Sequence, residues 1–313
     1  MTTLATRSRS ASRAAFSSGP RGSHRRFGDL RVALLFIAPA MIGFVVFYVL
    51  PTIRGIYLSF TEYNILGEPE WIGMENYQAI AKDPLFWNSL AVTGQYVFLN
   101  IALQTALALG LALLMHNVAK STLIRGTLLL PYLMSNVIAA LLWFWMLDYQ
   151  IGVVNQFIEW AGLPRVAFFG SEEWAIPTQA VINTWRHMGY TALLIFAGLQ
   201  SIPGHVYEVA KLDGASAWQT FRKITIPLLR PVLVLVLVVT VIGSFQVFDT
   251  VAVTTGGGPV NATRVIQYYI YQRAFTESDF GYGSAIAVIL FIILALVAFI
   301  QMKFLKGNES DLD

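Results

Sequence analysis

The chain has 313 residues, of which 56% are hydrophobic and only 12% are charged, and its formal net charge is +3. Soluble domains carry about one-quarter charged residues, so this composition excludes an ordinary soluble protein and predicts a chain that crosses a membrane. The absence of cysteine excludes disulfides and thiolate metal sites.

The first part of the chain, residues 1–31, is a basic segment rich in Ser, Arg, Gly and Ala. It has almost no apolar periodicity, so we expect a disordered tail, and its arginines favour the cytoplasmic side of a membrane. A basic arm is compatible with nucleic acid, but contact with anionic membrane lipid fits an orientation-setting tail better, so no nucleic-acid partner is expected. No short apolar segment with a cleavage site precedes the first long apolar stretch, so we expect no cleavable signal.

Six apolar stretches are long enough to cross a bilayer. They are Val32–Leu58, Leu90–Met115, Gly126–Leu147, Ala180–Leu199, Val232–Phe248 and Ser284–Phe304. The first contains Pro39 and Pro51, so we expect it to tilt or kink. The fourth is the weakest, because Asn183, Arg186 and His187 interrupt it. The predicted fold is an all-α polytopic membrane helix bundle with six transmembrane helices.

The charge of the connections orients this bundle. Basic residues gather in the N-terminal tail, in the second and fourth connections and at the C-terminal end, whereas the first and third connections are acidic and the fifth is mixed. Because positive connections stay inside, the pattern places the N- and C-termini in the cytoplasm. Aromatic residues on the outer side fit an interfacial belt or, equally, the bundle core: Trp71, Tyr77, Trp87, Trp143, Trp145 and Tyr149.

The fourth connection, residues 201–231, has the pattern of a short helix-turn-helix. We expect Ser201-Ile202-Pro203 to begin the first helix, because a hydroxyl caps a helix and proline is tolerated in a first turn. Gly214 is placed to end it in a left-handed conformation. A second helix is expected from about Ala215 to Ile224, before Pro227 interrupts the hydrogen-bond ladder. Periodicity alone favours an ordinary amphipathic loop.

The residues of this loop resemble the cytoplasmic signature of permease subunits in binding-protein-dependent ABC importers. The pattern is Glu208-x-Ala210-x-x-Asp213-Gly214-Ala215, followed by Ile224-x-Ile226-Pro227. It is most similar to the sugar-importer branch, which includes the maltose and glycerol-3-phosphate permeases, and it departs at Val209 and Ile226, where the family usually has alanine and leucine. Further resemblance lies at Phe248-Asp249, Thr255-Gly256-Gly257-Gly258-Pro259, Ala274-Phe275 and Asp279-Phe280-Gly281. The resemblance covers the chain from about Ala33 to Lys306.

This resemblance implies a type I ABC importer permease-like fold, with a permease domain over 32–306 and a short C-terminal tail over 307–313. It implies three kinds of partner besides membrane lipid: a second permease subunit, two ATPase subunits and an extracytoplasmic solute-binding protein. The loop would couple to the ATPases through Glu208, Ala210, Asp213, Gly214, Ala215, Trp218 and Phe221.

Two absent motifs bear on catalysis. The chain has no G-x-x-x-x-G-K-[ST] phosphate loop and no H-E-x-x-H or comparable metal spacing. We therefore expect a non-catalytic subunit with no cofactor or metal of its own, and ATP and Mg bound by the partner ATPases. Gly256-Gly257-Gly258 fits a flexible outer turn rather than a phosphate loop.

Polar residues within the spans, Asn136 and Asn183 among them, are candidates for a transport path, because their burial in lipid is costly. In the sugar-importer family the helices on either side of the signature loop line the substrate cavity, which gives as candidates Trp185, Arg186, His187, Tyr190, Ser244, Gln246, Phe248 and Asp249. Aromatic faces with amides and hydroxyls suit a sugar, whereas Arg186 suits a phosphate, and Arg186 and His187 also fit a place nearer the outer interface. For Asn100 and Gln104 we expect hydrogen bonds between helices.

Two other classes fit six spans with buried polar residues. An ATP-independent secondary transporter or channel has no need of a docking helix-turn-helix. A membrane scaffold has little use for Arg186, Gln246 or Asp249 within or at the ends of spans. The fourth connection therefore favours the importer permease over both.

Overall fold

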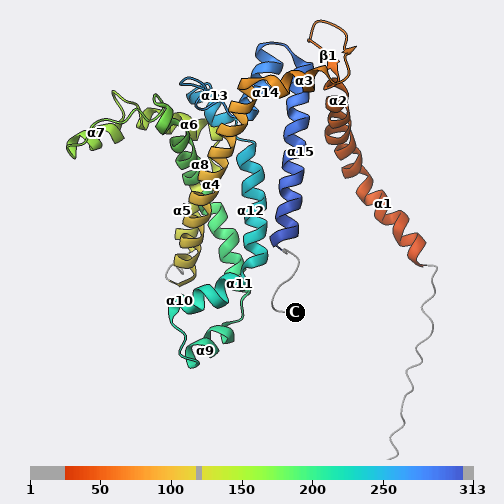
Figure 1. Ribbon diagram of the computed structural model, residues 1–313. Coiled ribbons are helices and arrows are strands. Elements are labelled where there is room, and N and C mark those ends of the chain that lie inside the picture. The colour runs from red at the N-terminus through yellow and green to blue at the C-terminus, as the bar shows by residue number, and fades with distance from the viewer. Residues whose placement is uncertain (1–24, 118–121, 306–313) are drawn as a thin grey trace, which may run out of the picture. The chain divides into compact units, whose positions relative to one another are not determined.

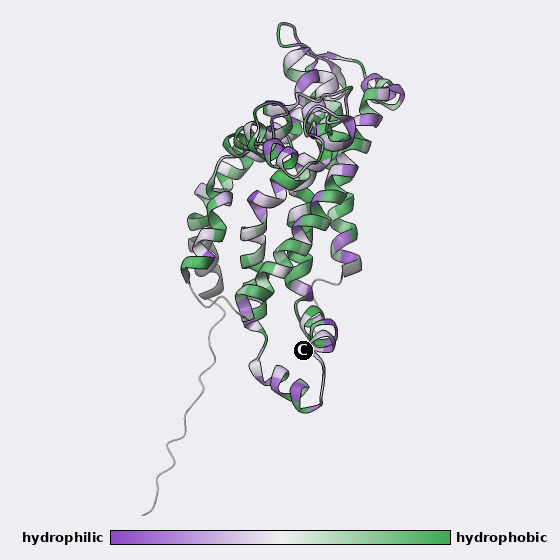
Figure 2. Cartoon of the chain, turned by 90° about the vertical axis from the view of Figure 1, so that its left-hand side faces the viewer, coloured by the Kyte–Doolittle hydropathy of each residue, from purple (hydrophilic) through white to green (hydrophobic). Residues whose placement is uncertain are grey.

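A computed structural model describes residues 25–117 and 122–305 (Figure 1). The residues fall into two compact units, 1–53 and 54–313, which are described separately. Four helices of the described chain are long and apolar enough to cross a membrane, or five if one bent pair counts as a single span. In Figure 2 hydrophobic residues predominate along the long helices, and hydrophilic residues are frequent in the connections.

The first unit is one apolar helical segment. Helix α1 (Arg25–Phe44) passes through a π-helical turn (Val45–Val49) into α2 (Leu50–Leu58). Residues 1–24 of the predicted tail lie outside the described residues, and residues 25–31 are helical rather than disordered. Large side chains of α1 are exposed, including Leu35 at 77% and Phe36 at 83%, as expected of a helix that faces lipid or another subunit.

The second unit begins with a small hairpin and two helices. Strands β1 (Thr61–Glu62) and β2 (Glu70–Trp71) pair antiparallel, and α3 (Glu75–Lys82) and the long α4 (Pro84–Asn117) follow. The hairpin is a short exception to the predicted all-α fold. Helix α4 contains the predicted second span, and its Ala108 and Ala112 pack against Ala192 and Ile195 in a buried cluster. Small residues at these positions let the helices approach closely.

The predicted third span is broken. Helices α5 (Thr122–Leu133) and α6 (Asn136–Met146) meet at an angle of 91°, so the expectation of one continuous helix over Gly126–Leu147 was wrong. Pro131 weakens the end of α5, and Ser135 has the extended ψ of 144° that starts a new helix. Helix α5 crosses α8 (Glu172–Ser201) so closely that a Cβ on Gly189 would lie 1.9 Å from the carbonyl oxygen of Leu128.

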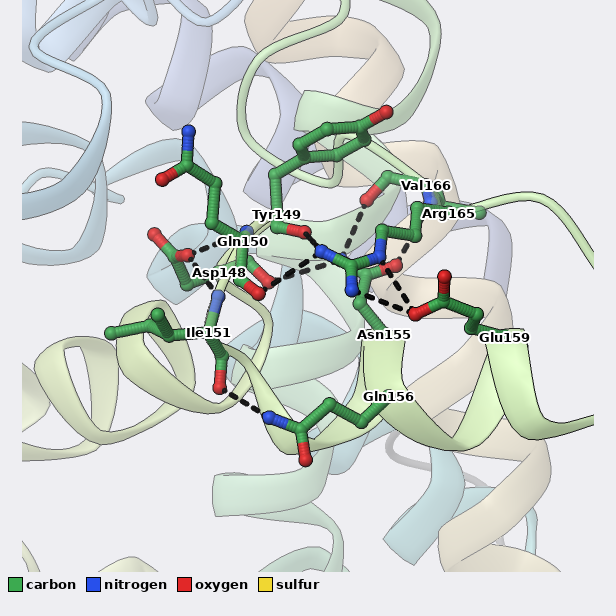
Figure 3. A network of polar contacts seen from close by, with 9 residues as sticks. All are labelled: Asp148, Tyr149, Gln150, Ile151, Asn155, Gln156, Glu159, Arg165 and Val166. Carbon is green, nitrogen blue, oxygen red and sulfur yellow. Dashed lines mark hydrogen bonds and ion pairs between the residues drawn. The ribbon is translucent and has the colours of Figure 1, made fainter.

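Between α6 and α8, the chain forms α7 (Val153–Trp160) and a loop fixed by Arg165 (Figure 3). The Arg165 guanidinium donates to the carbonyls of Tyr149 and Gln150 and to the carboxylate of Glu159, at 2.7 to 3.2 Å. The N–H groups of Ile151 and Gln150 donate to Asp148 and hold its pKa below the usual value. The buried Asn155 adds bonds to the carbonyls of Asp148 and Val166 and accepts from the N–H of Val166, so polar side chains fix much of this loop.

The remaining elements follow in this order: α9 (Gly204–Leu212), α10 (Ala217–Thr220), a π-turn (Phe221–Thr225), α11 (Ile226–Leu228), α12 (Arg230–Phe245), α13 (Asp249–Thr254), α14 (Ile266–Tyr271), a π-turn (Gln272–Thr276) and α15 (Phe280–Leu305). The predicted fourth span lies inside α8, which is long enough to cross a membrane but is not among the helices apolar enough to be counted. The predicted fifth span ends at Phe245, since residues 246–248 leave the helix before α13 begins.

Two of the π-turns end two residues before a proline. The turn Val45–Val49 precedes Pro51, and Phe221–Thr225 precedes Pro227. Proline lacks an N–H and its ring collides with the carbonyl four residues earlier, and a widened turn moves that carbonyl away. The predicted hydrogen-bond ladder is interrupted before Pro227, where the π-turn replaces α-helical bonds, but the helical backbone continues past the expected end near Ile224 into α11.

A tyrosine pair joins the start of α4 to α14 and α15. The hydroxyls of Tyr269 and Tyr282 donate to Asp83 at 2.5 and 2.7 Å. Partial burial disfavours the charged carboxylate, but these bonds and those from the backbone N–H groups of Leu85 and Phe86 outweigh it and hold the pKa of Asp83 below its usual value.

Candidate functional site

A polar cavity of about 270 Å³ lies among α4, the α5–α6 break, α8, α12 and the start of α13. Amides and hydroxyls supply most of its polar surface: Asn100, Gln104, Asn136, Asn183, Gln246, Thr191, Thr240 and Ser244. Tyr132, Tyr190 and Phe248 add aromatic rings, and His187 and Asp249 are its ionisable members besides the tyrosines. Apolar walls with a few placed polar groups are the usual composition of a small-molecule site.

The cavity brings together six of the eight predicted path residues, namely His187, Tyr190, Ser244, Gln246, Phe248 and Asp249. Trp185 does not line it, because its ring packs edge-on against Trp143 at a centroid distance of 5.5 Å. Arg186 does not line it either, since its guanidinium faces the backbone of the α5–α6 break.

Hydrogen bonds between helices hold one wall of the cavity, as expected for Asn100 and Gln104. The Asn100 amide donates to Ser244 of α12 at 2.8 Å and accepts from Asn183 of α8 at 2.8 Å. Gln104 donates to Thr191 of α8 at 2.9 Å. Asn100 and Gln104 are almost fully buried, and these bonds pair their amides while Asn100 joins α4 to α8 and α12 and Gln104 joins α4 to α8.

A second wall is a pair of tyrosines from different helices. The rings of Tyr132 and Tyr190 are stacked, with centroids 4.5 Å apart and an angle of 8° between their planes. Sequence reasoning identified Tyr190, and Asn136 as one of the polar residues within the spans, but it did not identify Tyr132. These two residues lie on either side of the break between α5 and α6, so no periodicity along the chain indicates that they face the cavity.

Arg186 stabilises that break. Its Nη2 donates to the carbonyls of Tyr132 and Met134 at 3.1 and 2.7 Å, and its Nε donates to Met134 at 3.0 Å. These carbonyls are free because the helix ends here. The guanidinium carbon also lies 5.4 Å from the centre of the Tyr132 ring. The charged residue in the polar part of α8 thus pairs the backbone carbonyls at the break between α5 and α6.

The loop between α8 and α12 carries the second group of predicted residues. Gly214 has a φ of +74°, which confirms the expected left-handed turn. Helix α10 is capped by Ser216, which accepts from the N–H of Gln219 while the Gln219 side chain accepts from the N–H of Ser216. The expected cap by Ser201 was wrong, because its hydroxyl donates to the carbonyl of Gly198 and Pro203 precedes α9.

This loop exposes apolar side chains beside polar ones. Leu212 is 87% exposed, Trp218 65% and Val209 52%, and the Trp218 ring contacts Phe221 at 5.5 Å. Glu208 and Asp213 are also exposed, whereas Ala210 is buried and Ala215 and Phe221 are partly buried. Figure 1 shows α9 and α10 at one end of the helices of this unit, beyond the end of α12.

Apolar helices surround a polar cavity, and the exposed helices α9 and α10 connect two of them, α8 and α12, along the chain. This arrangement is that of a membrane transport protein. A family model described as "binding-protein-dependent transport system inner membrane component" matches residues 104–307. The chain belongs to this family. It is a multi-pass inner-membrane protein and a permease subunit of an ABC importer, so it is not itself the ATPase.

Curated relatives of similar length agree. The chain is 35% identical to the sulfoquinovosyl glycerol transport system permease protein of Agrobacterium fabrum, over 90% of this chain and 92% of that one. It is 31% identical to the trehalose/maltose transport system permease protein of Thermococcus litoralis, over 90% and 96%. Among solved structures, a chain of a bacterial ABC transporter involved in import of the acidic polysaccharide alginate matches with a TM-score of 0.78 at 25% identity, over 90% of this chain and 98% of that one.

Proposed function

We propose that this subunit forms the translocation path for a sugar or a related polar solute, and that the cavity between α4, α8 and α12 is the solute site. The observation that carries the proposal is that the stacked Tyr132–Tyr190 pair lines one cavity together with the amides of Gln246 and Asn183. Aromatic faces pack on the C–H face of a sugar ring, and amides pair with its hydroxyls. The names of the relatives, which refer to sulfoquinovosyl glycerol and to trehalose and maltose, support the same class.

The loop 201–231 is the proposed coupling element. Exposed Leu212 and Trp218 offer a small apolar surface with Glu208 and Asp213 beside it, which suits a short helix bound in a groove of another protein. The cavity-lining helices α8 and α12 flank this loop, so a displacement of the loop acts directly on the cavity walls. ATP and Mg would bind the partner ATPases and not this chain.

The proposed assembly contains a second permease subunit, two ATPase subunits and an extracytoplasmic binding protein. The proposed topology has six spans, with α5 and α6 as one broken span, α8 as a polar span and both termini in the cytoplasm. Movement between inward-facing and outward-facing states would then be a rigid-body motion around a site within the membrane.

Cysteine labelling tests topology and path together, because this chain has no cysteine of its own. Single cysteines at Glu70, Glu172 and Val260, all exposed, are expected to react with a membrane-impermeant thiol reagent from outside, and Ser216→Cys is not. Thr263 is unsuitable for this purpose, because it is buried and bonded to Thr255 and Gly258. Modification of Gln246→Cys in the assembled importer is expected to block saccharide uptake, while the same reagent leaves the complex with the unsubstituted subunit active. Labelling of Ser216→Cys in intact cells would refute the orientation.

A further inference from the structure

Membership of the family leaves the charge of the solute open. One matched transporter imports an acidic polysaccharide, one relative is named for sulfoquinovosyl glycerol, which carries a sulfonate, and one is named for the uncharged sugars trehalose and maltose. The charge preference of this chain must therefore come from the groups that face its own cavity. Two of the nearby groups are potentially positive, Arg186 and His187, and one is negative, Asp249.

The positive groups have little capacity left for an anion. Arg186 uses Nε and Nη2 on the carbonyls of Tyr132 and Met134, and its Nη1 lies 2.9 Å from Nε2 of His187. Arginine has no acceptor, so Nη1 donates and Nε2 accepts. The other ring nitrogen, Nδ1, then donates to the carbonyl of Asn183 at 3.0 Å. His187 is thereby held as the neutral tautomer, with both nitrogens in use.

The negative group does face the cavity. Asp249 is partly exposed and is the only carboxylate among the described residues that line it. Its Oδ2 accepts one neutral hydrogen bond, from Asn136 at 2.8 Å. No residue of the described chain forms an ion pair with Asp249 within 4.0 Å, and the Arg186 guanidinium, which interacts with it electrostatically from farther away, does not line the cavity. The remaining polar lining consists of amides and hydroxyls, which pair with neutral hydroxyl groups.

We propose that this cavity admits uncharged polyhydroxylated solutes and disfavours anionic ones, with Asp249 as the specificity-determining residue and Arg186 as a positioning residue. The inference rests on the proposed function, since it concerns the same cavity. An approaching carboxylate, sulfonate or phosphate meets the Asp249 charge, while the guanidinium behind the wall has its donors on the backbone. A sugar without charge incurs no such repulsion, and its hydroxyls can donate to Asp249.

The test measures the sign of the electrostatic potential in the cavity and needs no knowledge of the solute. Gln246→Cys is placed in the full importer complex and modified with a cationic or an anionic methanethiosulfonate of similar size. The cationic-to-anionic rate ratio is divided by the ratio for a free thiol in solution. One carboxylate within several ångströms is expected to raise this quotient about fivefold at low salt, and 1 M salt is expected to reduce it. Asp249→Asn is expected to return the quotient toward one.

Two controls make each outcome decisive. Gly243→Cys provides a second site that lines the cavity, because a Cβ at Gly243 meets nothing within 4 Å. Val260→Cys, 80% exposed on the outer turn, is expected not to respond to Asp249→Asn. A quotient at or below one in either cavity cysteine, or one that Asp249→Asn leaves unchanged, would overturn the charge proposal while the path proposal stands. If neither cavity cysteine reacts with any reagent, the proposed solute path fails instead.

Discussion

The carboxylate of Asp249, the first residue of α13, accepts a hydrogen bond from the side chain of Asn136, the first residue of α6, at 2.8 Å. This bond joins the far side of the α5–α6 break to the segment that follows α12. Arg186 holds the near side of the same break to α8. The break is therefore bonded to α8 through Arg186 and to α13, the helix that follows α12, through Asn136 and Asp249, and both of these last residues line the cavity.

Removal of the hydrogen bond between Asn136 and Asp249 is expected to lower the stability of the complex. Asn136→Ala loses a hydrogen bond to a charged acceptor, which is worth about 1.5–3 kcal/mol. The matched control is Ser135→Ala, because Ser135 is exposed and its side chain forms no cap hydrogen bond. Thermal unfolding of the assembled complex is the measurement. Equal melting temperatures for the two variants would show that the bond does not contribute.

The bonds from position 186 to the carbonyls of Tyr132 and Met134 are expected to require arginine rather than positive charge alone. Lysine at position 186 has no planar fork and cannot hold Tyr132 and Met134 together in the same way. Arg186→Lys is therefore expected to reduce thermal stability and to loosen the Tyr132–Tyr190 stack, and uptake is expected to fall with it. Arg222→Lys, at an exposed position of the loop, is the control. Wild-type stability of Arg186→Lys would assign the residue a purely electrostatic role.

The turn of the coupling loop is expected to depend on its glycine. Gly214→Val forces a β-branched residue into left-handed backbone, which costs about 1–2 kcal/mol or more even though a Cβ there meets no neighbour. The expected result is an inserted permease with weaker ATPase association or with hydrolysis uncoupled from transport. Gly204→Val is the matched control, because Gly204 also has open space but no positive φ. Normal transport by the Gly214→Val complex would remove the loop from the coupling path.

The cavity residues Tyr190 and Gln246 are expected to act on uptake. Each offers one neutral hydrogen bond worth about 0.5–1.5 kcal/mol, so single alanine substitutions are expected to weaken uptake only several-fold. The Tyr190→Ala/Gln246→Ala double variant is expected to lose more while the complex still assembles. Uptake kinetics and complex yield are measured together, since a parallel fall of both would indicate helix packing. Unchanged kinetics in the double variant would exclude the pair from the path.

The Asp83 cluster predicts a dependence of stability on pH. The pKa of Asp83 is depressed in the folded chain by bonds from Tyr269 and Tyr282, so its contribution to stability is fully present above the unfolded pKa, near 4, and is lost as pH falls through the folded pKa. Asp83→Asn is expected to be less stable than the wild type at pH 7, and the difference is expected to shrink below about pH 4. Thermal unfolding across pH measures it. A difference that grows on acidification would contradict the assignment.

The sequence alone determined the class of this protein. Long apolar stretches report the cost of placing polar groups in lipid, and the spacing from Glu208 to Pro227 is local, so the membrane bundle and the family were both predictable. The left-handed Gly214 was predictable for the same reason, because it depends on a single residue.

Only the tertiary structure decided which polar residues meet. Tyr132 reaches Tyr190 because α5 packs closely against α8 at Leu128 and Gly189. The chain then bends by 91° between α5 and α6, and Arg186 of α8 pairs the carbonyls that the bend frees. The sequence placed Arg186 in the least apolar of the predicted spans but did not show what it binds. An arginine bonded to backbone and an arginine that faces a solute have the same neighbours in the sequence. The contacts that separate these two roles lie more than fifty residues apart along the chain, where neither periodicity nor spacing carries information.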